Sequence, residues 1–251
     1  MDYPEIYLAI DNCFASKRWT SPRDWMAIIK DVGVNYVEAS ADNECDPLYA
    51  DRQYLTDWVK EVLQSEKETG VKVASFYSGH GTYTTLGLTH DDVRNRSHIQ
   101  KNWIEPMIAM ATMFNAGLGF FCHAFPQKVL QNSREYYSRK DDLLDRLSHL
   151  ACFASEDKLP FISIEQMYTP HQIPWTIKGA KQLISNVYRR SKKNLYITID
   201  TGHQTGQKRF LRPELRQIEN TLKQFKKSCS NNLWLGTETA YNIFSDIAEK
   251  G

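Results

Sequence analysis

The sequence predicts an α/β fold, a (β/α) barrel of the TIM type that is incomplete, with about six to seven βα units. Short apolar and β-branched runs alternate with longer segments of helical periodicity along the chain. The runs recur at intervals of about 30 to 45 residues, which is the spacing of repeated βα units. No Walker loop or GxGxxG motif is present, so a barrel is favoured over a dinucleotide-binding fold.

The six predicted strands each end beside polar residues. They are Ile6 to Asp11, Asn35 to Ser40, Val71 to Tyr77, Leu118 to Phe125, Phe161 to Met167, and Leu195 to Asp200. A helix between consecutive strands returns the chain to the same edge of a sheet, so the strands are expected to be parallel.

The segments between the strands carry helix signals. The first helix begins at Pro22 and ends before Gly33, with one apolar face. That face is predicted to contain Trp25, Ile28, Ile29 and Val32. Further helices are predicted over Asp51 to Gly70, Thr89 to Gly117, Ser138 to Glu156, and Ile177 to Lys192. Pro106 is expected to kink or divide the third of these five helices.

The last part of the chain is too short for two more complete units. A helix is predicted over residues 212–229, a short strand over Leu233 to Leu235, and a helix containing residues 240–248. Two further βα units would need about 70 residues after the sixth unit. We therefore expect one domain, residues 1–251, that lacks its last one or two βα units and associates through the open sheet edge as a homo-oligomer.

Composition narrows the function classes. The 31 basic and 30 acidic residues leave a net charge of +1, which provides no strong field for nucleic acid or an anionic membrane. The five cysteines lack CxxC spacing, so neither a disulfide framework nor a zinc ribbon is indicated. The longest apolar stretch, Met107 to Phe121, is shorter than the roughly 18 residues of a membrane span. We expect a cytoplasmic protein with no nucleic-acid or membrane partner.

Acidic residues and histidines gather at the predicted carboxyl ends of the strands, which form the active face of a parallel barrel. These residues are Asp11, Asn12, Glu38, Asp42, Ser78, His80, His123, Glu165, Gln166, Asp200 and His203. A convergence of Glu, Asp and His is typical of a divalent cation site. Glu165 is the strongest candidate, because it follows an apolar run that would not bury an unpaired charge. The alternatives are that Asp200 merely caps the next turn and that each histidine has only a structural role.

Two short motifs carry a resemblance to a known family. "SIEQM" at the end of the fifth strand and "IDTGH" at the end of the sixth resemble the paired signatures of the xylose isomerase-like superfamily. The segment "SGHGTYTTLGLTHDDVRNRS" is similar to the substrate-side loop of those enzymes. The resemblance implies a metal-dependent isomerase or epimerase of a sugar or sugar phosphate, acting by proton abstraction next to a ketose carbonyl.

The resemblance also implies roles for individual residues. Glu165 would be a metal ligand and the proton-transfer carboxylate, and Asp200 a second ligand of Mn, Mg, Co or Zn. His203 would bind the substrate, or the metal as in some relatives. Relatives often carry a second carboxylate six residues after the first, where this chain has His171, which is therefore assigned to the substrate.

The residues themselves suggest two further substrate contacts and one aromatic wall. His80 lies between glycines that allow a ligand to approach the backbone, and Glu38 is placed to orient either a substrate hydroxyl or a neighbouring histidine of the site. His123 is expected to be a buried, hydrogen-bonded residue. Trp19, Phe76 and Tyr77 either wall a sugar pocket or pack in the core.

The family's two later ligands, a histidine and a glutamate, have no clear counterparts. No histidine follows His203, and the late acids near a predicted strand end are Glu238 and Asp246. A chain with so few ligands is expected to bind metal weakly and to turn over little sugar. Isomerisation and epimerisation both stay open.

Two alternative functions remain. The order His80, His123, Glu165, Asp200, His203 is similar to that of the apurinic endonucleases of the same superfamily, which hydrolyse DNA with bound metal. Near-neutral charge disfavours that function, because binding to a phosphate backbone requires a basic face. The second alternative is a non-catalytic fragment or binding module.

Overall fold

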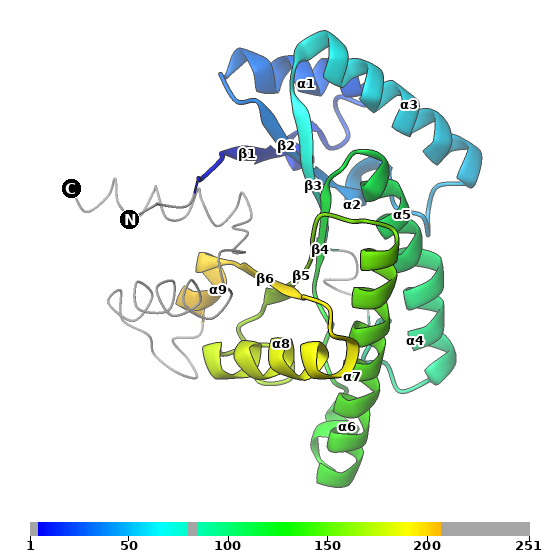
Figure 1. The fold of residues 1–251 in the computed structure, drawn as a ribbon, viewed down its shortest axis with the longest axis vertical. Coiled ribbons are helices and arrows are strands. Elements are labelled where there is room, and N and C mark those ends of the chain that lie inside the picture. Colours follow the sequence, from blue (N-terminus) through cyan, green and yellow to red (C-terminus); the bar gives the residue numbers. More distant parts are fainter. Residues whose placement is uncertain (1–4, 80–84, 207–251) are drawn as a thin grey trace, which may run out of the picture.

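The computed structural model of the chain describes residues 5–79 and 85–206, and it contains a six-stranded parallel sheet. The strands follow one another in sequence order, so that each pairs with the next. They are β1 (Ala9–Asp11), β2 (Tyr36–Ser40), β3 (Lys72–Ser78), β4 (Gly117–Phe120), β5 (Ile162–Gln166) and β6 (Tyr196–Ile199). The sheet curls into an open half-barrel with helices around its outer side (Figure 1). The predicted fold class is confirmed.

Two strands are at least three residues shorter than predicted, whereas the other four differ from the prediction by two residues or fewer. β1 begins at Ala9. Ile6, Tyr7 and Leu8, which were predicted to belong to this strand, precede it and are exposed. β4 ends at Phe120, before His123, whose backbone adopts a left-handed conformation with φ 64°. This conformation turns the chain away from the sheet, since a strand requires negative φ.

The long helices overlap the predicted segments. The long ones are α1 (Pro22–Asp31), α3 (Arg52–Thr69), α7 (Ser133–Glu156) and α8 (Ile177–Ser191). Four short helices of the described chain were not predicted: η1 (Asn12–Ala15), α2 (Ala41–Glu44), α6 (Gln127–Leu130) and α9 (Thr201–Gly206). α3 has clear signals at both ends: the Asp51 side chain accepts a hydrogen bond from the Tyr54 backbone N–H, and Gly70 closes the helix at φ 76°.

The predicted third helix is interrupted as expected near Pro106. It consists of α4 (Val93–Ile99), the π-helical segment η2 (Gln100–Ile104) and α5 (Glu105–Met113). Pro106 lies in the first turn of α5. Proline has no backbone N–H, so it cannot donate the hydrogen bond that a continuous α-helix would need at this position. The wider π turn therefore carries the chain past the proline.

The predicted apolar face of α1 was partly wrong. Val32 is 63% exposed, while Pro22 and Met26 are buried with Trp25 and Ile29. Val32 lies beyond the last helical residue, Asp31, so it does not continue the buried stripe.

The two faces of the sheet differ in character. Side chains on the outer face pack against helices: Phe76 lies 5.4 Å from Phe114 and 6.2 Å from Trp58, measured between ring centroids. Phe76 is therefore a core residue and not part of a sugar pocket. The inner face carries small or polar residues, and Ser163 shares a hydrogen bond of 2.8 Å with Thr198. This face leads to the carboxyl ends of the strands.

Several predictions concern other parts of the chain. The predicted helix over residues 212–229, the strand at Leu233 to Leu235 and the acids Glu238 and Asp246 lie outside the described residues. The described helices include none that is long and apolar enough to cross a membrane. The four cysteines in the described ranges are free thiols.

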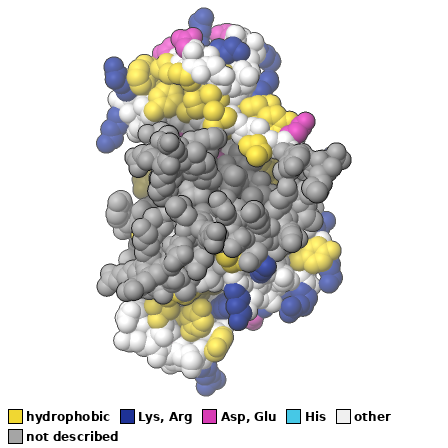
Figure 2. Space-filling view, turned by 90° about the vertical axis from the view of Figure 1, so that its left-hand side faces the viewer, with side chains coloured by type: hydrophobic (Ala, Val, Ile, Leu, Met, Phe, Trp, Pro, Cys, Tyr) yellow, Lys and Arg dark blue, Asp and Glu magenta, His cyan; other side chains and the backbone are white. Residues whose placement is uncertain are grey.

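Association through the sheet edge stays a prediction. Exposed apolar side chains do precede the edge strand β1, at Ile6, Tyr7 and Leu8. The open side of the half-barrel also shows hydrophobic side chains near both ends of the molecule (Figure 2).

Candidate metal and substrate site

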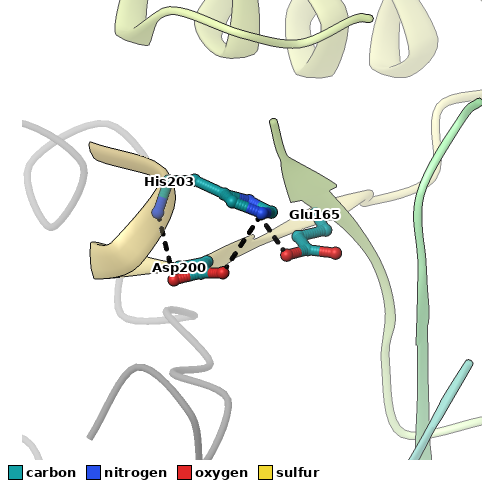
Figure 3. Close-up of side chains that lie close together, drawn as sticks. All are labelled: Glu165, Asp200 and His203. Atoms are coloured by element: carbon teal, nitrogen blue, oxygen red, sulfur yellow. Dashed lines mark hydrogen bonds and ion pairs between the residues drawn. The ribbon is translucent and has the colours of Figure 1, made fainter. Parts of the chain in front are cut away.

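Three side chains meet at the carboxyl ends of β5 and β6 (Figure 3). Glu165 comes from β5, Asp200 directly follows β6, and His203 lies on α9. One donor atom of each residue lies within 4.8 Å of the donors of the other two. Glu165 and Asp200 are only 8% and 7% exposed, so two carboxylates are buried side by side. Buried carboxylates require nearby positive charge.

Asp200 uses its two oxygens for different tasks. Oδ1 accepts hydrogen bonds from the backbone N–H groups of Gly202 (2.6 Å) and His203 (3.2 Å), which caps the start of α9. Oδ2 lies 3.3 Å from Nε2 of His203. Asp200 therefore caps the turn and also contributes to the acidic cluster, so the two interpretations of this residue are compatible.

His203 lies between the two carboxylates. Its Nδ1 is 3.1 Å from Oε1 of Glu165 and donates to the Gln166 carbonyl oxygen at 3.0 Å. Burial alone lowers the pKa of His203, but the hydrogen bond and charge of Glu165, with the charge of Asp200, outweigh it and raise the pKa to about 9. The imidazole is therefore protonated at neutral pH and partly balances the two carboxylates.

Tyr77 reaches the same cluster from β3. Its phenol donates a hydrogen bond to Oε2 of Glu165, the oxygen that does not face His203. Tyr77 was one of three aromatic residues expected to wall a pocket or pack in the core. It is half-buried and lies on the wall of the cavity described next.

A cavity of about 420 Å³ opens beside the cluster, which is within the usual size range of small-molecule sites. Its described wall consists of Tyr77, Gly79, Phe121, Glu165, Met167, Tyr168, Gln172, Asp200, Gly202 and His203. The ring of Tyr168 lies 4.9 Å from the ring of His203. Aromatic and apolar groups thus face carboxylates and an imidazole across one space, an arrangement suited to the C–H and O–H groups of a sugar.

The structure places the other predicted substrate residues elsewhere or outside the described ranges. His171 is exposed and is not on the cavity wall, whereas its neighbour Gln172 is. Glu38 is buried on β2, where Oε2 accepts a hydrogen bond of 2.6 Å from Ser75, and it too is absent from the described wall. His80 lies outside the described residues. A substrate-binding role for His171, Glu38 or His80 stays a prediction.

The histidine order expected for an endonuclease is not reproduced in the described cluster. His123 is buried, with its ring 4.5 Å from Phe121 and 6.3 Å from Trp103, and it is not a member of the Glu165 cluster. Asp11 accepts a hydrogen bond of 2.7 Å from the Cys13 backbone N–H and so caps a turn. The contacts described for these two residues are packing and capping contacts.

Sequence reasoning missed several wall residues. Phe121, Met167, Tyr168 and Gln172 were not assigned to the site, although the first three lie just beyond strand ends. Glu165 was identified because the carboxyl ends of parallel strands form the active face. The loop residues directly after each strand lie on the same face and could have been assigned on the same ground. Gln172 carries no such signal, because its position depends on the path of the loop after β5.

Comparisons with solved structures confirm the xylose isomerase-like fold. A candidate xylose isomerase of Rhodospirillum rubrum matches with a TM-score of 0.78 and 18% identity, over 92% of this chain and 77% of that one. The 3-keto-D-glucoside 4-epimerase of E. coli matches with a TM-score of 0.66 and 15% identity, over 93% and 80%. A D-psicose 3-epimerase solved with D-fructose matches with a TM-score of 0.59 and 14% identity, over 80% and 65%.

The sequence itself matches no family model and no curated protein. At identities of 14% to 18%, the structural matches establish the fold, and the reaction has to be argued from the site.

Proposed function

We propose that this chain, which has the xylose isomerase-like fold, is a metal-dependent isomerase or epimerase of a ketose. The observation that carries the proposal is the cluster of Glu165, Asp200 and His203 on the wall of a cavity of about 420 Å³ at the carboxyl ends of parallel strands. Sugar isomerases and epimerases are prominent among the structural neighbours, which supports the same reaction class.

The donor set fits a divalent cation. Two carboxylate oxygens suit Mn, Mg, Co or Zn, and His203 becomes a third donor when metal binding displaces a proton from its ring. The two buried carboxylates carry more negative charge than His203 balances, so a cation bound by Glu165 and Asp200 would complete the neutralisation. Such an ion, when bound, supplies Lewis acid polarisation of a substrate carbonyl.

The chain's own residues supply binding and proton transfer. Glu165 lies on the cavity wall with both carboxylate oxygens held, and it is the group we assign to take a proton from the carbon beside the carbonyl. His203 is positioned to hydrogen-bond a substrate oxygen, and Tyr168 to pack against the sugar. A single shuttling base gives isomerisation, whereas a second base on the opposite face gives epimerisation.

The described wall favours a free sugar over a sugar phosphate. Among the described wall residues, His203 is the one with a positive charge, and it already faces two carboxylates. A phosphate group is usually bound by arginine, lysine or a row of backbone N–H groups. Aromatic and apolar wall residues suit the C–H faces of an unphosphorylated ketose instead.

A substrate panel tests the proposal. The full chain, loaded with Mn²⁺, is incubated with free ketoses and ketose phosphates, and products are separated by chromatography. We expect conversion of at least one free ketose, and loss of at least 100-fold in rate for Glu165→Gln because the proton acceptor is removed, by the roughly 10²–10⁴-fold contribution of such groups. Glu156→Gln, the same change at an exposed position on α7, is the control. Failure to convert any member of the panel would refute the proposal.

A further inference from the structure

A glycine on β4 leaves the inner face of the sheet open beside Tyr77. Gly119 pairs with Tyr77 of β3 on one side and with Ser163 of β5 on the other. A Cβ atom at Gly119 would lie 3.0 Å from Cδ2 of Tyr77, 3.0 Å from Oγ of Ser163 and 3.4 Å from Oγ1 of Thr198. The two contacts at 3.0 Å are tighter than normal van der Waals distances, so a side chain here would require Tyr77 or Ser163 to shift by a few tenths of an ångström.

Tyr77 uses this space to reach across β4. Its ring passes beside Gly119, and its hydroxyl donates to Oε2 of Glu165, which lies on β5 and 88 residues away in the sequence. β3 and β5 are not neighbours in the sheet, because β4 lies between them. A larger residue at position 119 would occupy the space that the tyrosine ring needs.

The two oxygens of Glu165 are therefore held by different partners. Oε2 accepts from the Tyr77 phenol, and Oε1 lies 3.1 Å from Nδ1 of His203. A carboxylate with a single partner can rotate about its terminal bond, which is a broad and soft torsion. A carboxylate held at both oxygens keeps one orientation, with Oε1 directed into the acidic cluster.

We propose that Tyr77 is a positioning residue that fixes the orientation of Glu165, and that Gly119 is the residue whose lack of a side chain makes this contact possible. The inference rests on the proposed function, since it assigns Glu165 the role of a metal ligand. Hydrogen-bond partners of metal ligands typically change metal affinity or activity by about 10- to 100-fold when removed. If Tyr77 only filled space, loss of its hydroxyl would leave metal affinity unchanged.

Metal titration separates these two roles. Mn²⁺ is titrated by calorimetry into the full chain and into Tyr77→Phe, Gly119→Ala and the double variant. We expect about tenfold weaker Mn²⁺ binding for Tyr77→Phe, by the general effect of such partners. Gly119→Ala should also weaken binding, because the added methyl displaces the ring. The double variant should be no weaker than Tyr77→Phe, because both changes act through one hydrogen bond.

Tyr136→Phe is the matched control. Tyr136 is a half-buried tyrosine on α7 that packs against Phe125, away from the cluster. Removing its hydroxyl should leave Mn²⁺ affinity at the wild-type value. Thermal unfolding within a few degrees of wild type would show that each variant is folded.

The outcomes distinguish the inference from the proposed function. Mn²⁺ affinity of Tyr77→Phe within twofold of wild type would overturn the inference, as would losses that simply add in the double variant. No Mn²⁺ binding by the wild-type chain would overturn the inference and the proposed function together. Weakened Mn²⁺ binding in Tyr77→Phe, with no ketose converted by the wild-type chain, would support the positioning role of Tyr77 and refute the proposed function.

Discussion

The ion pairs of His203 predict a pH-dependent stability of the metal-free protein. Its pKa is raised from 6.5 to about 9 in the folded state, chiefly because the carboxylates of Glu165 and Asp200 outweigh the effect of burial. A group with a raised folded pKa stabilises the fold fully below its unfolded pKa, and this contribution is lost as pH rises through the folded value. Stability from His203 is therefore present below about pH 6.5 and lost by pH 9 to 10.

The size of the effect follows from the same two values. At 1.36 kcal/mol per pH unit, the difference between 6.5 and about 9 corresponds to roughly 3 kcal/mol. The His203 side chain is 21% exposed, so solvent reduces the pairing energy and we expect about 1 to 3 kcal/mol.

Urea unfolding of the EDTA-treated protein measures this contribution. Free energies of unfolding are obtained from pH 6 to pH 10 for wild type, His203→Gln and the control His98→Gln, which changes an exposed histidine on α4. Wild type and His98→Gln should lose about 1 to 3 kcal/mol more over this range than His203→Gln, by the linkage argument above. Parallel curves for wild type and His203→Gln would refute the ion-pair assignment.

Three further predictions concern the cavity, the core and the expected lack of nucleic-acid binding. Tyr168→Ala should raise KM for a converted ketose about tenfold with a smaller change in kcat, because the ring contributes to substrate binding. The control Tyr188→Ala, on the exposed side of α8, should leave KM unchanged. Both are measured by steady-state kinetics, and a change in kcat alone for Tyr168→Ala would contradict the prediction. Phe76→Ala should destabilise the chain by about 3–5 kcal/mol and Phe76→Leu by less, measured by urea unfolding, and equal losses would contradict the packing argument. The chain should show no salt-sensitive binding to duplex DNA with an abasic site in a fluorescence anisotropy titration, whereas tight binding that weakens with salt would favour the endonuclease alternative.

The sheet could be predicted because its signals are local. Each strand is an apolar run ended by polar residues, and parallel strands bring those ends to one edge. This is why Glu165 and Asp200 were assigned to one site, and the structure does bring their side chains together with His203. The predicted length of β4 was wrong because the left-handed backbone conformation of His123 cannot be recognised from a run of mostly apolar residues.

The rest of the site depends on contacts that no local pattern carries. Tyr77 contacts Glu165 across a third strand, beside Gly119, which has no side chain. The assignment of His171 followed the spacing in related proteins, which does not give the path of the loop after β5, where Gln172 lies on the described cavity wall. The spacing of residues along a strand is fixed by geometry, whereas the path of a loop depends on its tertiary contacts.

Deuterium exchange tests the central claim most directly, since that claim is that Glu165 exchanges a proton with the carbon beside a ketose carbonyl. A free ketose is incubated in D₂O with the Mn²⁺-loaded chain, and deuterium at that carbon is followed by NMR, which detects proton abstraction even when little product forms. The account predicts incorporation by wild type and Glu156→Gln, and at least 100-fold slower incorporation by Glu165→Gln, by the size typical of general base removal. Incorporation at equal rates by wild type and Glu165→Gln, or none above the metal-only background, would contradict it.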